Sequence, residues 1–347
     1  MAFRRIALFG DPQGVPQMLP HLADVGKLAV VRASIRPAQS AEMEQLAAAA
    51  GARLFVQPKA KSAEFSAFLA ELESFNPDLI LINSYSMILS PDVLSIPRGS
   101  TINVHGALLP QYRGANVTEW ALINEEYQSG VTMHRVDAGI DTGAIVDQES
   151  VPLRFEDTWI DARARINRAT DVLLKKRMPL VLAGQIDAKP QDESQAHHWH
   201  RRRPEDGRFE WHWPLRRIYN LVRALVAPHP GAWYEADGRT EVLDRWLSLP
   251  KLAELKGQIV GGWQYGNSAL MPHASSNADA AREIANASFA FDVGGMSAGL
   301  TSVDYRSGTA RAVVNNPSAN SEILSALIRF AEEELFLKHV ETSVGAI

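Results

Sequence analysis

The chain has 347 residues, of which 46% are hydrophobic, 22% charged and 8% aromatic. This composition is typical of a globular protein and argues against a disordered, collagen-like or coiled-coil chain. The formal net charge of −5, from 35 basic and 40 acidic residues, disfavours a nucleic-acid coat protein or a binder of anionic membranes. The chain contains no cysteine, which excludes disulfides, thiolate metal sites and cysteine nucleophiles.

Chain length and hydropathy lead to two expectations about organisation and location. A single core rarely exceeds about 250–300 residues, so we expect two domains. No apolar run approaches the ~20 residues that span a bilayer. The apolar stretch after Arg4 and Arg5 is too short for a signal-peptide core. We therefore expect a soluble, cytoplasmic protein with no membrane partner.

Strand and helix patterns alternate along the first half of the chain. Apolar runs predict strands at residues 6–9, 28–33, 53–56, 79–82 and 101–104. Apolar residues at helical spacing predict helices at residues 41–50 and 63–75. This alternation, with strands apolar on both faces, indicates a Rossmann-like α/β fold, a mostly parallel sheet with helices on both faces. Ligands of such sheets bind beyond the carboxyl ends of the strands, so we expect a site after Ile82 and around Val104.

The second half of the chain begins with a long predicted helix at residues 158–183, which Pro179 should kink or interrupt near its end. A shift to Pro, Gln, His, Arg and Asp marks residues 188–204 as a linker. Beyond the linker we expect helices at 215–225 and 321–338, with short strands near residues 232–234, 241–249, 258–260, 289–293 and 310–314. These patterns divide the chain into a first domain, 1–187, and a smaller, β-rich C-terminal domain with a terminal helix, 205–347. That helix either covers a subunit interface, as in a homodimer, or faces the core.

A candidate catalytic group follows the fifth predicted strand. Asn103 and His105 are two residues apart, so their side chains point to the same side of the sheet. An amide can stabilise a developing oxyanion and an imidazole can move a proton near neutral pH, which suits acyl transfer. Asp141, in a loop bracketed by Gly139 and Gly143, could orient His105 and keep it basic. An Asn-x-His pair alone is more often structural, and the aspartate improves the case only modestly.

Several motifs in order resemble the 10-formyltetrahydrofolate-dependent formyltransferase family. They are Asn-x-His at 103–105, Leu-Leu-Pro at 108–110, Arg-Gly at 113–114, Gly-Val-Thr at 130–132 and Asp-x-Gly-x-Asp-x-Gly at 137–143. The resemblance covers roughly residues 1–245. Within the family, the pattern is most similar to sugar N-formyltransferases, the lipid A aminoarabinose formyltransferase domain and methionyl-tRNA formyltransferase.

The resemblance implies that residues 1–187 form a folate-binding catalytic domain, with Asn103, His105 and Asp141 as its catalytic residues. An acceptor amine would attack the formyl carbon, Asn103 would hold the oxyanion, and His105, tuned by Asp141, would handle the proton. The co-substrate would be 10-formyltetrahydrofolate, with no metal. The implied cofactor contacts are Tyr85, Ser86, Met87, Ile88, Leu89, Asp137, Gly139 and Ile140. The implied substrate contacts are Tyr112, Arg113 and Gly114, with Arg113 a candidate for phosphate.

The identity of the acceptor depends on where the chain departs from the family pattern. Gly106 and Ala107 stand where relatives often have Ser or Pro, Val117 replaces a common proline, and Glu125 replaces a frequent glycine. All four are expected to border the acceptor pocket, so these departures affect which acceptor is bound and not the type of reaction. Methionyl-tRNA formyltransferase typically has a basic loop that contacts the tRNA. The corresponding loop here is short and acidic-leaning, so we expect no nucleic-acid partner.

We therefore expect a small-molecule amine acceptor, first a nucleotide-linked amino sugar. An ornithine-type amine, an antibiotic or siderophore precursor and a different one-carbon unit stay open. A formyltetrahydrofolate hydrolase is disfavoured because such proteins usually carry an N-terminal regulatory module. An inactive folate-binding protein would be expected to lack one of the three catalytic residues.

Two further histidine features have ordinary structural interpretations. The run from His197 to His200 is disfavoured as a metal site because adjacent histidines point apart and no carboxylate lies at ligand spacing. His134 follows a strand pattern, and we interpret it as a satisfied structural histidine rather than as a group that supports the catalytic residues.

Overall fold

The computed structural model describes residues 3–97, 100–265, 268–273, 287–293, 296–314 and 321–344. The chain divides into two compact units. The first unit comprises Met1–Thr118, Gln128–Pro152 and Arg163–Arg201, and the second comprises Glu119–Tyr127, Leu153–Ala162 and Arg202–Ile347. Within the described residues, no helix is both long and apolar enough to cross a membrane. The domain boundaries expected from composition stay a prediction.

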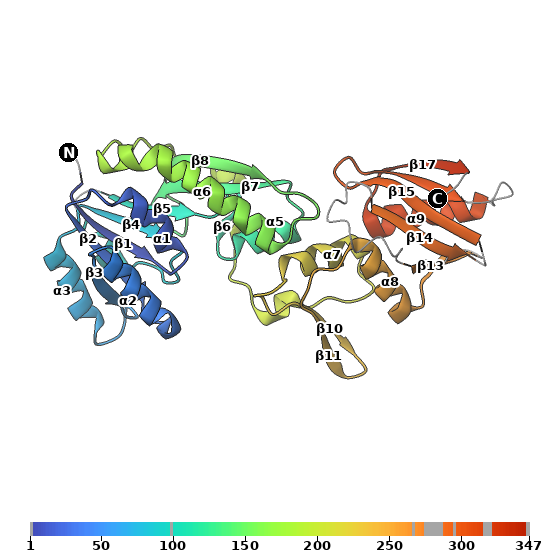
Figure 1. The fold of residues 1–347 in the computed structure, drawn as a ribbon, viewed down its shortest axis with the longest axis horizontal. Coiled ribbons are helices and arrows are strands. Elements are labelled where there is room, and N and C mark those ends of the chain that lie inside the picture. Colours follow the sequence, from blue (N-terminus) through green and yellow to red (C-terminus); the bar gives the residue numbers. More distant parts are fainter. Residues whose placement is uncertain are drawn as a thin grey trace. The chain divides into compact units, whose positions relative to one another are not determined.

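A seven-stranded sheet with the order β3-β2-β1-β4-β5-β7-β8 forms the centre of the first unit (Figure 1). Its strands are β1 Arg5–Gly10, β2 Lys27–Ala33, β3 Arg53–Gln57, β4 Leu79–Asn83, β5 Ser100–His105, β7 Gln128–Arg135 and β8 Ile145–Pro152. The first five pair in parallel, and β7 and β8 extend the sheet in antiparallel fashion. The predicted mostly parallel α/β fold is confirmed.

Helices cover both faces of this sheet, because alternate strand residues feed two separate apolar clusters. They are α1 Gly14–Met18, α2 Ser40–Ala49, α3 Phe65–Phe75, α4 Pro91–Leu94 and α6 Trp159–Leu182. Ile6 and Leu8 of β1 pack in a cluster with residues of α1, α2 and α6. Ala7 and Phe9 pack in the other cluster, with residues of α3 and α4. The α6 helix contains Pro179 and continues to Leu182, so the proline does not interrupt it, and a kink there stays a prediction.

The carboxyl ends of β1 and β4 are held close to the start of α1. A Cβ atom built on Gly14 would lie only 2.2 Å from the carbonyl oxygen of Asn83, so a larger residue there would push the two elements apart. Asn83 also donates from its side chain to the carbonyl oxygen of Gly14, at 3.1 Å. This close approach fixes the start of α1 against the edge of the sheet at which β1 and β4 end.

The second unit contains helices and a separate sheet. α7 spans Leu215–Ala224, α8 Leu249–Val260 and α9 Ser321–Leu335, and α5, Val117–Ile123, lies at the junction of the units along the chain. β10 Ala232–Ala236 and β11 Arg239–Leu243 form a hairpin. A six-stranded sheet follows, made of β12 Trp263–Tyr265, β13 Ser268–His273, β14 Ala287–Val293, β15 Met296–Asp304, β16 Thr309–Val314 and β17 His339–Val344. The β-rich character predicted for this part is confirmed.

Two strand predictions in this unit are wrong, one in part and one in full. The strand expected at residues 241–249 ends at Leu243, and Leu249 begins α8. Residues 258–260 belong to α8, whose first turn is capped by the Ser248 hydroxyl and whose end is marked by Gly261 at a φ of 83°. Leu252, Ala253 and Lys256 are buried on one side of that helix, which is helical spacing rather than strand alternation. The predicted terminal helix is confirmed as α9, and its buried Phe330 packs edge-on against Trp263 and against phenylalanines of β14.

Candidate active site

The first unit contains a cavity of about 690 Å³ at the carboxyl ends of β1, β4 and β5. This is the edge at which the sequence predicts a site. Asn103 and His105 of β5 line the cavity, together with Asp141 from the loop after β7. The cavity volume lies in the usual range for a small-molecule site, about 300–1,000 Å³.

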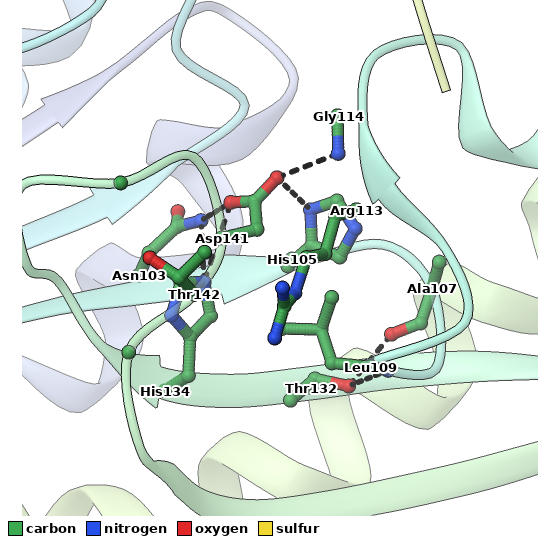
Figure 2. Close-up of polar contacts among 12 residues, drawn as sticks. Asn103, His105, Ala107, Leu109, Arg113, Gly114, Thr132, His134, Asp141 and Thr142 are labelled. Atoms are coloured by element: carbon green, nitrogen blue, oxygen red, sulfur yellow. Dashed lines mark hydrogen bonds and ion pairs between the residues drawn. The ribbon is translucent and has the colours of Figure 1, made fainter. Parts of the chain in front are cut away.

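The three predicted catalytic residues converge around the Asp141 carboxylate (Figure 2). Its Oδ2 lies 3.6 Å from His105 Nδ1 and accepts a hydrogen bond of 2.9 Å from the backbone N–H of Gly114. Its Oδ1 accepts from Asn103 Nδ2 at 3.4 Å and lies 3.5 Å from His134 Nε2. Two strands and two loops therefore bring one carboxylate, one amide and two imidazoles together.

The protonation of this group follows from its neighbours. Burial by itself raises the pKa of Asp141, but the charge on His105, the neighbouring His134 and the Gly114 N–H outweigh it and hold that pKa well below its usual range. Asp141 is therefore an anion at neutral pH. The carbonyl oxygen of Tyr112 lies 2.7 Å from His105 Nε2, and since a carbonyl only accepts, that ring nitrogen carries a proton. The Asp141 carboxylate faces Nδ1 across 3.6 Å, so the arrangement places an imidazole, a group that can exchange a proton, beside an amide donor.

Thr132, in the Gly-Val-Thr motif, fixes the loop that follows His105. Its buried hydroxyl donates to the carbonyl oxygen of Ala107 at 2.7 Å and accepts from the backbone N–H of Leu109 at 3.2 Å (Figure 2). The side chain of Gln148 donates to both the Leu109 carbonyl and the Thr132 hydroxyl, each at 2.9 Å. A hydroxyl is required here because the loop needs an acceptor and a donor from one small side chain.

The two loops expected to hold the cofactor face the same cavity. All eight residues predicted for that contact line it: Tyr85, Ser86, Met87, Ile88, Leu89, Asp137, Gly139 and Ile140. Ile88 is 76% exposed and Ile140 48% exposed, so each loop presents an apolar side chain that is covered by little of the protein. Asp137 closes its own loop by accepting from Gly139 N–H and from the Thr142 hydroxyl. Two exposed apolar side chains from two loops of one cavity suit a flat aromatic ligand.

The residues expected to bind substrate occupy different surroundings. Gly114 lines the cavity, whereas Tyr112 and Arg113 are not among the described residues that line it. Tyr112 stacks on Trp199 at a ring separation of 5.5 Å. Arg113 is only 2% exposed, and its guanidinium donates to Glu193 and to Gln191. A phosphate-binding role for Arg113 stays a prediction, and it would require the guanidinium to leave these two partners.

The segment from Lys189 to Arg201 contacts the loop that carries Asp141 and holds it in place. The sequence alone does not predict this contact. Gln191 donates from Nε2 to the carbonyl oxygens of Asp141 and Gly143, at 2.7 and 2.8 Å. Its Oε1 accepts from two nitrogens of Arg113, at 3.1 and 2.9 Å. Because composition marks this segment only as a polar linker, no sequence signal singles out Gln191.

Further along the same segment, β9, His198–Trp199, pairs in parallel with β6, Arg113–Gly114. Gly114 has a φ of 104°, and a Cβ atom on it would lie 2.1 Å from the carbonyl oxygen of Trp199. Glycine is therefore required at this position for two reasons, its backbone conformation and its contact with β9. The N–H of the same residue donates to Asp141, so the pairing also sets the carboxylate.

Other polar residues of the cavity were not predicted. They include Asp11, Gln17, Arg163, Asn167, Thr170, His200 and Arg201. Arg163 Nη2 donates to the side chains of Gln13 and Ser84, both at 3.4 Å, and Nη1 lies 3.6 Å from where a Cβ on Gly106 would be. Among the residues that depart from the family pattern, Gly106 and Val117 line the cavity, while Glu125 lies in the second unit and pairs with Arg216.

Comparison with known proteins assigns the chain to a family. A family model described as Formyl transferase matches residues 7–178, and one described as Formyl transferase, C-terminal domain, matches residues 202–259. The chain belongs to the formyltransferase family, as its motifs predict.

A curated relative agrees with this assignment. The bifunctional polymyxin resistance protein ArnA of Wigglesworthia glossinidia brevipalpis is 38% identical over 162 residues, 47% of this chain. The match covers 25% of that protein, so the chain spans about a quarter of the length of this curated relative.

Two solved structures share the fold. A sugar N-formyltransferase from Shewanella sp FDAARGOS_354 has a TM-score of 0.57 and 20% identity, over 70% of this chain and 96% of that one. An N-formyltransferase from Helicobacter canadensis, in complex with folinic acid and dTDP-3-aminofucose, has a TM-score of 0.54 and 18% identity, over 67% of this chain and 84% of that one.

Proposed function

We propose that this protein transfers a formyl group from 10-formyltetrahydrofolate to the primary amine of a small acceptor, and that the acceptor is a nucleotide-linked amino sugar. The observation that carries the proposal is the convergence of Asn103, His105 and Asp141 in one cavity with both predicted cofactor loops. Membership of the formyltransferase family supports the reaction type.

The cavity fits the folate donor in size and character. When bound, 10-formyltetrahydrofolate would supply the formyl group. Ile88 and Ile140 would cover its flat ring system, which would bury apolar surface that solvent now reaches. The backbone of the loop from Tyr85 to Leu89 would offer the hydrogen-bonding groups that a pterin needs.

Each catalytic side chain has a task that its surroundings support. The Asn103 amide would donate a hydrogen bond to the negative charge that develops on the formyl oxygen when the acceptor amine attacks. The bond between the formyl carbon and N10 of the folate would break as the new amide bond forms. His105, beside the anionic Asp141, would help to pass the proton that the amine loses to the leaving N10. The nucleophile belongs to the acceptor, so no serine or lysine of the protein is required.

Polar side chains of the cavity lining support a charged, hydroxyl-rich acceptor. The cations Arg163 and Arg201 suit phosphate oxygens, and the carboxylate of Asp11 and the amide of Asn167 suit hydroxyl groups. The Helicobacter canadensis structure was determined with dTDP-3-aminofucose, a ligand of this class.

The test is a coupled assay with 10-formyltetrahydrofolate and a panel of nucleotide-linked amino sugars, which follows release of tetrahydrofolate. We expect turnover with one sugar, and its loss in His105→Ala and Asn103→Ala. His212→Ala, the same change at an exposed histidine of the second unit, is the control. Turnover with ornithine or a peptide amine but no sugar would overturn the acceptor assignment. Release without any acceptor would indicate a hydrolase.

A further inference from the structure

His134 and Asn103 lie directly opposite one another on paired strands. β7 and β5 are antiparallel, and Asn103 is the register partner of His134. Opposite residues of an antiparallel pair project to the same face, so the two side chains meet. His134 is only 1% exposed, and its Nε2 lies 3.1 Å from Asn103 Nδ2 (Figure 2). The sheet itself therefore fixes this contact.

Hydrogen bonding determines which nitrogen of His134 carries the proton. Nδ1 lies 2.7 Å from the carbonyl oxygen of Arg135, and a carbonyl can only accept, so Nδ1 is protonated. In the neutral ring Nε2 is then an acceptor. Nδ2 of Asn103, a donor, lies 3.1 Å from it, closer than Asp141 Oδ1 at 3.5 Å. A proton on Nε2 would instead set two donors against each other at 3.1 Å. The neutral ring with its proton on Nδ1 satisfies both contacts.

This contact decides which way the Asn103 amide faces. One Nδ2 hydrogen is held by His134, and the second points toward Asp141 Oδ1 across 3.4 Å, which is long for a hydrogen bond. The amide is therefore anchored by one hydrogen and keeps the other in a weak bond that a stronger acceptor can replace. Without an acceptor at position 134, the amide could rotate and present its oxygen where a donor is required.

We propose that His134 is a positioning residue. It orients the Asn103 amide so that the second amide hydrogen, the one in the weak bond to Asp141, can turn to the charge that develops during formyl transfer. This inference rests on the proposed function and replaces the interpretation of His134 as a purely structural histidine. Side chains that hold a reacting group in one orientation lower the reorganisation needed in the transition state.

A matched pair of substitutions tests the proposal. His134→Gln places an amide oxygen near the position of Nε2 and keeps the acceptor, whereas His134→Asn reaches only the position of Nδ1 and loses it. We expect His134→Asn to lower kcat by roughly 10- to 100-fold with little change in KM, and His134→Gln to recover most of that loss; loss of the oxyanion donor itself costs about 10²- to 10³-fold. Because His134 acts through Asn103, the double variant His134→Asn, Asn103→Ala should be no slower than Asn103→Ala alone.

A spectroscopic measurement keeps this proposal separate from the proposed reaction. In ¹⁵N-labelled protein we expect His134 Nδ1 protonated and Nε2 unprotonated. The Asn103 side-chain N–H signals, assigned by their absence in Asn103→Ala, should shift in His134→Asn but not in His134→Gln. If wild-type protein shows no formyl transfer while these signals behave as stated, the proposed function fails and the orientation of Asn103 by His134 stands. A protonated Nε2, full activity in His134→Asn, or a loss that adds to that of Asn103→Ala would overturn the positioning role.

Discussion

The side-chain amide of Gln191 donates to the carbonyl oxygen of Asp141 at 2.7 Å, so a residue 50 positions along the chain holds the backbone of the candidate catalytic carboxylate. The same amide group donates to Gly143, and its oxygen accepts from Arg113. The orientation of Asp141 therefore depends on a segment outside its own loop.

Replacing Gln191 with glutamate should lower kcat while the protein stays folded. The carboxylate keeps the acceptor for Arg113 but loses both donors and sets negative charge against two carbonyl oxygens. We expect a loss of roughly 10-fold or more, since displaced catalytic groups are costly. Gln195→Glu, a change of the same kind at an exposed residue of the segment, is the control. Equal kcat in the two variants would show that Gln191 does not support the loop.

Asp141→Asn should remove the charge of the site without disturbing its backbone. Asp141 has a φ of 55°, a conformation that asparagine tolerates well. We expect kcat to fall by about 10²-fold or more, because the protonated form of His105 loses its counter-ion. Asp187→Asn, the same change at an exposed residue that does not line the cavity, is the control. If both variants lose activity equally, the Asp141 charge does not explain the effect.

Arg163→Gln should weaken binding of a phosphate-bearing acceptor and leave the chemistry intact. A hydrogen bond to a charged group is worth about 1.5–3 kcal/mol, so we expect KM for the nucleotide-linked sugar to rise by roughly 10- to 100-fold. The KM for the free amino sugar, which carries no phosphate, should stay unchanged. Arg168→Gln, on an exposed position of the same helix, is the matched control. Equal effects on both acceptors would exclude a phosphate contact at Arg163.

The ion pairs of Asp147 should make stability depend on pH in a defined direction. Burial by itself raises the pKa of Asp147, but hydrogen bonds from Arg177 and Lys176, at 2.6 and 2.7 Å, outweigh it and lower the pKa to about 2. A carboxylate whose pKa is lower in the folded than in the unfolded state stabilises the fold above the unfolded value, 3.8, and loses that contribution as pH falls toward 2.

Asp147→Asn should therefore reduce the free energy of unfolding at pH 7 by about 1 kcal/mol, because the Lys176 ammonium is half exposed and screened by solvent. The difference from wild type should shrink between pH 4 and pH 2. Urea unfolding across this range measures it, with Asp24→Asn at an exposed position as control. A difference of constant size down to pH 2 would rule out the ion pairs as its source.

Much of the first unit can be predicted from sequence because its strands are continuous apolar runs. Residues 79–82 are buried on both faces of the sheet, and no amphipathic alternative competes for such a segment. Asn103 and His105 could be placed together for a similar reason, since strand geometry alone sets residues two apart on one face. Their distance to Asp141 depends on loop structure, and only the family motif indicated it.

The remaining features depend on contacts that local patterns do not encode. The contact of His134 with Asn103 requires the register of two strands that lie about 30 residues apart. Gln191 lies in a polar stretch whose composition looks like that of any linker. The sequence of α8 predicts a strand in part because its apolar end, near Ile259 and Val260, is short enough for either structure.

The pairing of β6 with β9 also determines how this protein can be recombined with its relatives. The segment that ends at Arg201 contacts Arg113, Gly114 and the Asp141 loop closely. At position 114 it leaves room for no side chain larger than that of glycine. A chimera joined at residue 188 would take this segment from one parent and the catalytic loop from the other. A junction placed after Arg201 keeps the segment and the catalytic loop from the same parent. The C-terminal part can then be exchanged while the chemistry stays that of the parent that supplies residues 1–201.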